Sequence, residues 1–141
     1  MMDMRECIEQ GFLVRIRPDN ALVDKALKEA EYDLGSARDA LADEDFKWAI
    51  IKAYYAMFHA ARAVVFALGY KERRHFAVQI VLENLAKEGK LEGVWLNYFS
   101  AAMDNREGAD YRYSYSKETA EEQVRNAGEF LARMKKLSGA V

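Results

Sequence analysis

Cysteine, proline and histidine are scarce in this sequence. Its 141 residues include one cysteine, Cys7, one proline, Pro18, and two histidines, His59 and His75. A single cysteine excludes an intrachain disulfide, so nothing here requires an oxidising compartment. A single proline leaves long stretches free to be helical, because proline interrupts helix interiors. We expect Cys7 to lie near a mobile end of the chain, as an incidental thiol rather than a nucleophile.

A strong charge of one sign and a long apolar run are also missing. The 21 lysines and arginines nearly balance 23 acidic residues, and the net charge of −2 gives no global attraction for nucleic acid or anionic membrane. The most apolar window, Ala53 to Gly69, carries His59 and Arg62 near its middle and is short for a bilayer crossing. The N-terminal segment is charged and lacks the apolar centre of a secretory signal. We therefore expect a cytoplasmic protein without membrane contact.

Apolar residues recur at helical spacing along most of the chain, and the length fits one domain over residues 1–141. Asp19 or Asn20 can cap the first long helix. Residues Asn105 to Ser116 are interpreted as a helix end and loop. Short connections favour antiparallel neighbours, so the sequence predicts an all-α, up-and-down antiparallel bundle of four to five helices. The predicted helices are Asn20 to Asp43, Asp45 to Leu68, His75 to Lys87, Leu91 to Arg106 and Lys117 to Leu137.

The predicted helix from Asp45 to Leu68 is apolar on most of its sides. Such a helix is buried on most sides, and we expect one small bundle to leave part of it uncovered. The sequence therefore predicts a homodimer, with Tyr54, Tyr55 and Phe58 as candidates for the subunit contact.

Metal and cofactor motifs are missing from the sequence. A di-iron bundle needs two Glu-x-x-His pairs that project inward, and the two histidines do not supply both. A phosphate-cradling glycine loop and a G-x-S-x-G elbow are also absent. We expect no metal and no cofactor, and we interpret His59 and His75 as structural or anion-facing groups.

Two groups of basic residues are candidates for binding an anion. His59 and Arg62 stand three apart, and either both are polar groups at the edge of the core that bond neighbouring helices or a partner subunit, or Arg62 supplies charge to a cleft between subunits. Lys71, Arg73, Arg74 and His75 precede a predicted helix, whose free amide groups would add to their attraction for phosphate. The alternative is an ordinary solvated loop.

The most unusual cluster combines arginines with tyrosines near the predicted loop. Tyrosine rings stack on bases, and arginine binds phosphate or stacks as well. The alternative is a structural corner in which Arg106 pairs with Asp110 and the tyrosines pack the end of the bundle. The members of the cluster are Arg106, Asp110, Tyr111, Arg112, Tyr113 and Tyr115.

Taken in order, several of these residues resemble a prokaryotic branch of the HEPN domain family. The resemblance rests on the stretch AIIKAYYAMFHAARA from Ala49 to Ala63, on Gly69, His75 and Gly89-Lys-Leu91, and on Arg106-x-x-x-Asp110-Tyr111. It covers roughly residues 20–135. It implies a four- or five-helix homodimer that is often the partner of a small nucleotidyltransferase, in toxin–antitoxin or defence gene pairs. Many members are metal-independent ribonucleases with an R-x(4-6)-H motif in the groove between subunits.

This sequence departs from that motif. Arg106 matches the arginine that steadies the phosphate, but Asp110 or Tyr111 stands where the proton-transferring histidine belongs. Neither replaces imidazole easily, because both residue types titrate well away from neutral pH. His75 could substitute only if the fold brings it beside Arg106.

Three functions follow from these observations as alternatives. The first is a HEPN-like dimer that partners a nucleotidyltransferase and binds nucleotide or RNA. The second is a metal-independent ribonuclease toxin, with Arg106 and Tyr111 as the catalytic candidates. The third is a purely structural interaction protein. The candidate ligand-binding residues are Arg62, Arg74, His75, Arg106, Asp110, Tyr111 and Tyr113.

Overall fold

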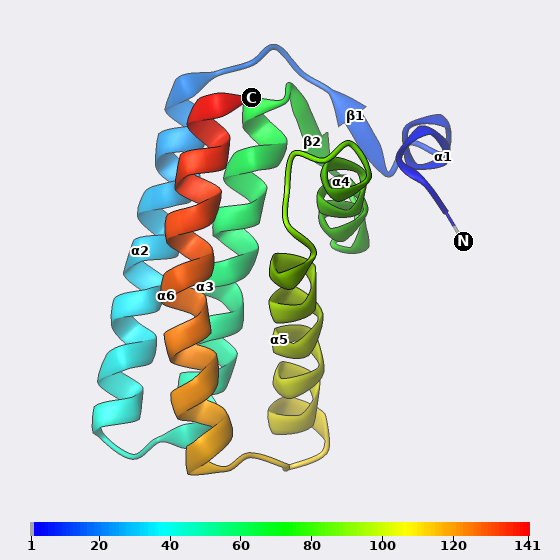
Figure 1. Cartoon of the computed structure of the whole chain (residues 1–141). Helices are drawn as coiled ribbons and strands as arrows, with labels where there is room; N and C mark the ends of the chain where they lie inside the picture. Colours follow the sequence, from blue (N-terminus) through cyan, green and yellow to red (C-terminus); the bar gives the residue numbers. More distant parts are fainter. Residues whose placement is uncertain (1) are drawn as a thin grey trace.

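Four long helices lie side by side and form the body of the molecule (Figure 1). The computed structural model describes residues 2–141. Among the long helices, α3 is central, because it contacts α2, α5 and α6 as well as the shorter helix α4. The predicted all-α bundle is confirmed, with a small two-stranded sheet added to it. The long helices are α2 (Asn20–Ala42), α3 (Phe46–Ala67), α5 (Gly93–Tyr111) and α6 (Lys117–Ala140).

Side-chain caps determine where the long helices begin. The Asp19 carboxylate accepts a hydrogen bond of 2.8 Å from the backbone N–H of Ala21, so Asp19 rather than Asn20 caps α2. Asp45 and Ser116 cap α3 and α6 in the same way. Each cap satisfies an amide group that the first turn of a helix leaves free, which fixes the helix start locally.

The central helix α3 is covered by its own chain. Tyr54 and Phe58 are only 3% and 4% exposed, and Tyr55 is half-buried. The argument that one bundle could not cover this helix is therefore wrong. Small side chains explain the close packing, because alanine lets neighbouring backbones approach. The homodimer itself stays a prediction that now depends on the family resemblance alone. The fully buried alanines of α3 are Ala49, Ala53, Ala56, Ala60, Ala61 and Ala63.

A smaller unit lies beside the upper half of the bundle in Figure 1. It consists of α1 (Met4–Glu9), the antiparallel strands β1 (Leu13–Arg15) and β2 (Tyr70–Glu72), and α4 (Phe76–Lys87). The sequence did not predict α1 or the strands, which are too short to show a hydrophobic period. Cys7 on α1 is fully buried, so the expectation of a mobile end is wrong.

Helix α5 is longer than expected, since it continues to Tyr111 instead of ending near Arg106. The added turn contains Gly108. A Cβ atom there would stand 3.2 Å from Nη2 of Arg112 and 3.4 Å from the carbonyl oxygen of Ser114. The chain folds back over α5 at this point, and the glycine provides room for it. The connection to α6 is therefore much shorter than the predicted loop.

A buried polar side chain joins three helices. Gln123 on α6 is 3% exposed, and its Nε2 donates a hydrogen bond of 2.8 Å to the carbonyl oxygen of Ile50 on α3. Its Oε1 accepts one of 2.8 Å from Nδ2 of Asn105 on α5. These bonds hold α5 at a fixed position against α3 and α6, one residue away from Arg106.

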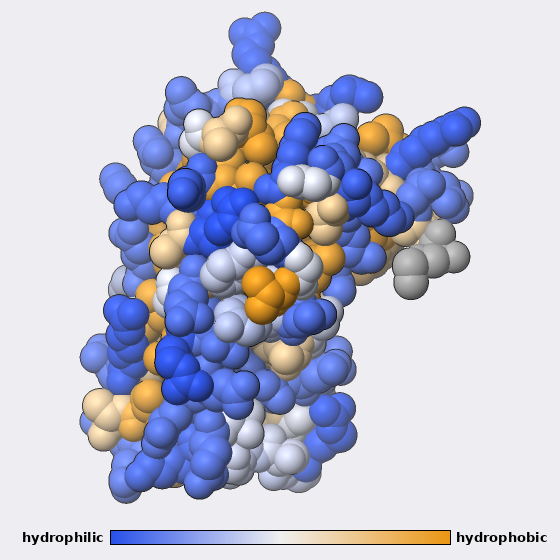
Figure 2. Space-filling model, in the orientation of Figure 1, coloured by the Kyte–Doolittle hydropathy of each residue, from blue (hydrophilic) through white to orange (hydrophobic). Residues whose placement is uncertain are grey.

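Figure 2 shows the face of the molecule that is turned to the viewer in Figure 1. Its surface is mostly hydrophilic, and apolar side chains gather in its upper half. Within residues 2–141, no helix is both long enough and apolar enough to cross a membrane.

Candidate functional site

Arg106 lies on α5 between two tyrosine rings. Its guanidinium carbon is 5.1 Å from the ring centre of Tyr54 and 5.9 Å from that of Tyr111. Its Nη1 is 3.7 Å from Oδ2 of Asp110, one helical turn further on. The structure therefore brings Arg106, Asp110 and Tyr111 together, as the spacing along the helix predicts. The Arg106 side chain is 20% exposed and packs on rings rather than reaching into a cavity of the single chain.

The hydrogen bonding of Arg106 is incomplete. Its Nε is buried and is the one buried side-chain nitrogen or oxygen between residues 2 and 141 without a hydrogen-bond partner. The 3.7 Å separation from Asp110 is also longer than a hydrogen bond. A purely structural arginine usually fills its donors, because an unpaired buried polar group costs free energy. The guanidinium is thus held in place by ring packing while part of its hydrogen-bonding capacity stays unused.

Exposed tyrosines surround the end of α5. Tyr111, Tyr113 and Tyr115 are 69%, 82% and 48% exposed. Tyr113 has a φ of 53°, in the left-handed region where residues other than glycine are rare. Arg112 turns back and donates from Nη2 to the carbonyl oxygen of Asp104 at 3.1 Å. The predicted structural corner is therefore only partly present, because these tyrosine rings face solvent instead of packing the bundle.

Beneath Arg106, the Tyr54 side chain is almost fully buried. Burial raises the pKa of Tyr54, and the positive charge of Arg106 partly offsets that shift. The Tyr54 ring stacks on that of Phe99 with 6.1 Å between ring centroids, and its centroid lies 6.3 Å from that of the Phe58 ring. These rings form a rigid floor that fixes the position of the guanidinium.

The structure does not bring the other candidate residues to this end of the bundle. Arg62 donates from Nε to both carboxylate oxygens of Glu72 at 2.8 and 3.0 Å, and so joins α3 to β2. Arg74 lies 5.9 Å from the ring centre of Phe12. These contacts lie at the hairpin end of the molecule, away from the α5–α6 connection (Figure 1).

His75 does not pair with Arg106. It is exposed, and its ring packs at a tilt against that of Phe58 with 4.4 Å between centroids. The rings of Phe58 and Tyr54 stand between His75 and Arg106 in this row of contacts. No imidazole therefore takes the place of the histidine that the R-x(4-6)-H motif requires.

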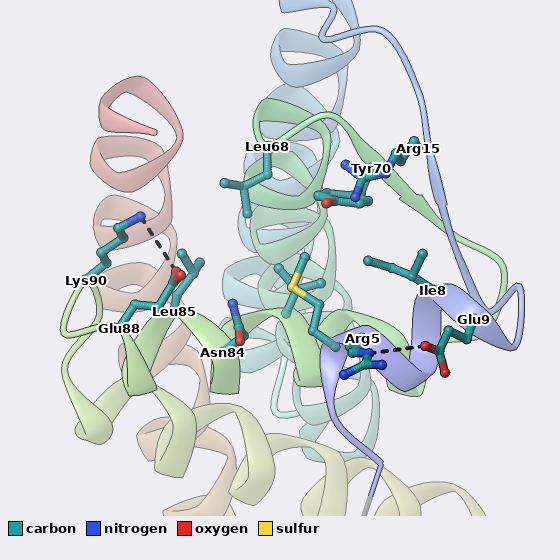
Figure 3. Close-up of a pocket in the computed structure, with 12 residues that line it drawn as sticks. Arg5, Ile8, Glu9, Arg15, Leu68, Tyr70, Asn84, Leu85, Glu88 and Lys90 are labelled. Carbon is teal, nitrogen blue, oxygen red and sulfur yellow. Dashed lines mark hydrogen bonds and ion pairs between the residues drawn. The ribbon is translucent and has the colours of Figure 1, made fainter.

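A cavity with a volume of about 640 Å³ lies elsewhere. Figure 3 shows it between α1, the two strands and α4, with Ile8, Leu68 and Tyr70 on its wall. Ion pairs stand at its edge: Arg5 contacts Glu9 at 3.2 Å, and Lys90 contacts Glu88 at 3.6 Å. None of the candidate residues named from the sequence lines this cavity.

The structure also assembles a cluster that the sequence did not reveal. Glu29 and Asp33 on α2 face His59 on α3, and one ligand atom from each lies within 4.8 Å of the others. Burial lowers the pKa of His59 and raises that of Asp33. The charge of Asp33 partly offsets the shift of His59, and the charge of His59 partly offsets that of Asp33. The only signal in the sequence is the four-residue spacing of the two acids. Nothing in it shows that His59 lies opposite them.

The HEPN domain model matches residues 23–137. The chain belongs to the HEPN family. The match includes α3, α4, α5 and nearly all of α2 and α6, so the resemblance read from the sequence is confirmed. The N-terminal helix α1 and strand β1 lie outside it.

Several curated proteins are similar to this HEPN chain. A UPF0332 protein of Pyrococcus horikoshii is 33% identical over 85 residues, which is 60% of each chain. A UPF0332 protein of Archaeoglobus fulgidus is 32% identical over 98 residues, or 70% of each chain. A protein of Methanocaldococcus jannaschii named as a candidate toxin is 28% identical over 127 residues, with 82% of this chain and 94% of the relative covered.

A solved structure supports the fold. The crystal structure of TT1696 from Thermus thermophilus superposes with a TM-score of 0.71 at 19% identity, covering 82% of this chain and 97% of that one. At this identity the likeness concerns the fold alone.

Proposed function

We propose that this HEPN protein binds RNA or a nucleotide at the end of α5, and that it does so as a homodimer in partnership with a small nucleotidyltransferase. The observation that carries the proposal is the state of Arg106. Its guanidinium is positioned by Tyr54 and Tyr111, and the 3.7 Å separation from Asp110 leaves Nη1, unlike the buried Nε, available to an acceptor from outside the chain. A phosphate group is a suitable acceptor for such a guanidinium.

The exposed tyrosines support the same ligand class. Base stacking on an aromatic ring contributes roughly 1–3 kcal/mol per base and tolerates any sequence. Tyr111 offers one such ring beside the arginine, and Tyr113, two residues further along the chain, exposes a second. Because the net charge is −2, attraction for RNA has to come from this local patch. Binding should therefore weaken with salt, but with a shallow slope that reflects few phosphate contacts.

A metal-independent ribonuclease is the second candidate. The names of the Methanocaldococcus jannaschii relatives, which describe candidate toxins, favour it. The residues around Arg106 argue against it, since Asp110 and Tyr111 occupy the place of the histidine and His75 lies beyond Phe58. We therefore propose binding as the main activity and cleavage as weak or absent.

Fluorescence anisotropy with a labelled 20-nucleotide RNA, and calorimetry with ATP, test the proposal. We expect Arg106→Ala to weaken binding of at least one probe about tenfold or more, which corresponds to about 1.4 kcal/mol. Tyr111→Ala should weaken it several-fold. Arg17→Ala is the control: this arginine is exposed and precedes α2, at the opposite end of the bundle.

Stability measurements separate binding from packing. The melting temperature of Arg106→Ala should fall only slightly, because its ion pair is longer than a hydrogen bond. A large fall in melting temperature with unchanged binding would leave the structural corner as the better account. A denaturing gel of the same RNA, for the wild type and Arg106→Ala, reports cleavage. Arginine-dependent cleavage would favour the ribonuclease. Copurification with the product of a neighbouring nucleotidyltransferase gene tests the partnership separately. Failure to copurify would contradict the partnership without affecting the binding proposal.

A further inference from the structure

Three side chains capable of binding a metal converge between α2 and α3, apart from the Arg106 site. Glu29 and Asp33 stand one turn apart on α2, so both project from one face of that helix. His59 projects toward them from α3, with its Nε2 3.7 Å from Oδ2 of Asp33. That distance is too long for a hydrogen bond. The imidazole and the carboxylate thus face each other without bonding directly.

The spacing suits a metal ion between the two groups. Zinc lies about 2.0–2.2 Å from nitrogen and oxygen ligands, which places neighbouring ligand atoms of a tetrahedral site roughly 3.4 Å apart. The observed 3.7 Å is close to that value. The ligand atoms of Glu29, Asp33 and His59 lie within 4.8 Å of one another. Glu29 is exposed and can change its rotamer, which would bring its carboxylate closer to the other two ligand atoms.

Packing holds the imidazole in position. The His59 and Asp33 side chains are 23% and 19% exposed. The ring of Phe58 meets that of His59 edge-on at 5.6 Å, and the ring of Tyr55 lies 6.5 Å away. A ligand whose orientation is set before the metal arrives loses less conformational freedom on binding.

A pocket of about 280 Å³ adjoins the cluster, and both Glu29 and His59 line it. A metal held by three protein ligands would therefore keep an open coordination position toward this pocket, as metal sites that also bind water or substrate do. Lys25 and Lys71 line the same pocket, while the charge of Arg62 is offset by Glu72. The lysines suit an anion as the further ligand of the metal.

We propose that Glu29, Asp33 and His59 form a binding site for one divalent transition-metal ion of the zinc and manganese class. One imidazole and two carboxylates match the ligand preferences of these ions, whereas calcium and magnesium prefer oxygen alone. The site goes beyond the proposed function and is independent of Arg106. The sequence does not reveal this site, because its ligands are divided between two helices.

Zinc binding to the untagged protein tests the site, since a histidine tag would bind the same ions. After removal of metal with a chelator, isothermal titration with ZnCl₂ should show one ion per chain. Asp33→Asn keeps the shape of the side chain, and we expect it to weaken zinc binding tenfold or more. His59→Asn should do the same. Zinc should raise the melting temperature of the wild type but not of Asp33→Asn.

The chain provides two matched controls. His75→Asn removes its other imidazole, and Cys7→Ser removes its thiol. Both should bind zinc as the wild type does. Absence of saturable binding in the wild type would overturn the proposal. So would unchanged affinity in Asp33→Asn, or an equal loss in the His75→Asn control, which would indicate adventitious surface binding. Circular dichroism of each variant confirms that lost binding does not reflect unfolding.

Discussion

Gln123 provides a quantitative test of how α5 is held in place. In the Gln123→Ala variant, two hydrogen bonds of 2.8 Å disappear, one to Ile50 and one from Asn105. Each contributes about 0.5–1.5 kcal/mol net, and the emptied space in a site that is 3% exposed adds to the loss. We therefore expect unfolding to become easier by about 2–3 kcal/mol.

Chemical and thermal unfolding followed by circular dichroism measure this change. For a chain of this size, 1 kcal/mol corresponds to roughly 2–4 °C, so the melting temperature should fall by roughly 5–10 °C. Gln79→Ala is the matched control, because Gln79 also donates one side-chain hydrogen bond, of 3.0 Å to Ser100, but is only half-buried. Its loss should cost no more than about 1.5 kcal/mol.

A double-mutant cycle with Asn105→Ala tests whether the bonds act as a network. The two substitutions should be non-additive by about 0.5 kcal/mol or more, since the side chains contact each other directly. Equal losses in Gln123→Ala and Gln79→Ala, or strict additivity with Asn105→Ala, would refute the reasoning. RNA binding should also weaken in Gln123→Ala, because α5 carries Arg106.

Three further predictions rest on particular contacts, and a fourth on the family resemblance. Hydrogen bonds from Arg133 and Trp95 lower the pKa of Glu92 from 4.5 to about 2. The stabilising contribution of Glu92 is therefore complete above about pH 4.5 and is lost as the pH falls toward 2. Thermal unfolding should show the difference in melting temperature between the wild type and Glu92→Gln shrinking over that pH range. Glu72→Ala leaves Arg62 without its partner and should destabilise the fold by about 2–3 kcal/mol in urea unfolding. Gly69→Ala should cost about 1–2 kcal/mol by the same assay, because φ is 87° and a Cβ would meet Pro18 at 3.3 Å. Sedimentation at micromolar concentration should show a homodimer, and a clean monomer would contradict it.

The sequence alone was sufficient to predict the four long helices and α4, though not the end of α5, and one contact of the candidate site. Helix starts depend on caps such as Asp19, Asp45 and Ser116, which act within a few residues and so can be recognised locally. The pairing of Arg106 with Asp110 has the same origin, since residues four apart on a helix are neighbours whatever surrounds the helix.

Tertiary packing decided what covers the apolar helix α3 and what its polar residues face. Periodicity shows that Tyr54 and Phe58 are apolar positions, but not whether a second subunit or the chain's own helices bury them. Arg62 pairs with Glu72 because a short hairpin, without a period of its own, places the carboxylate there. His59 meets Glu29 and Asp33 because α2 and α3 pack in one particular register. Contacts between helices depend on that register, and a single sequence carries no local signal for it.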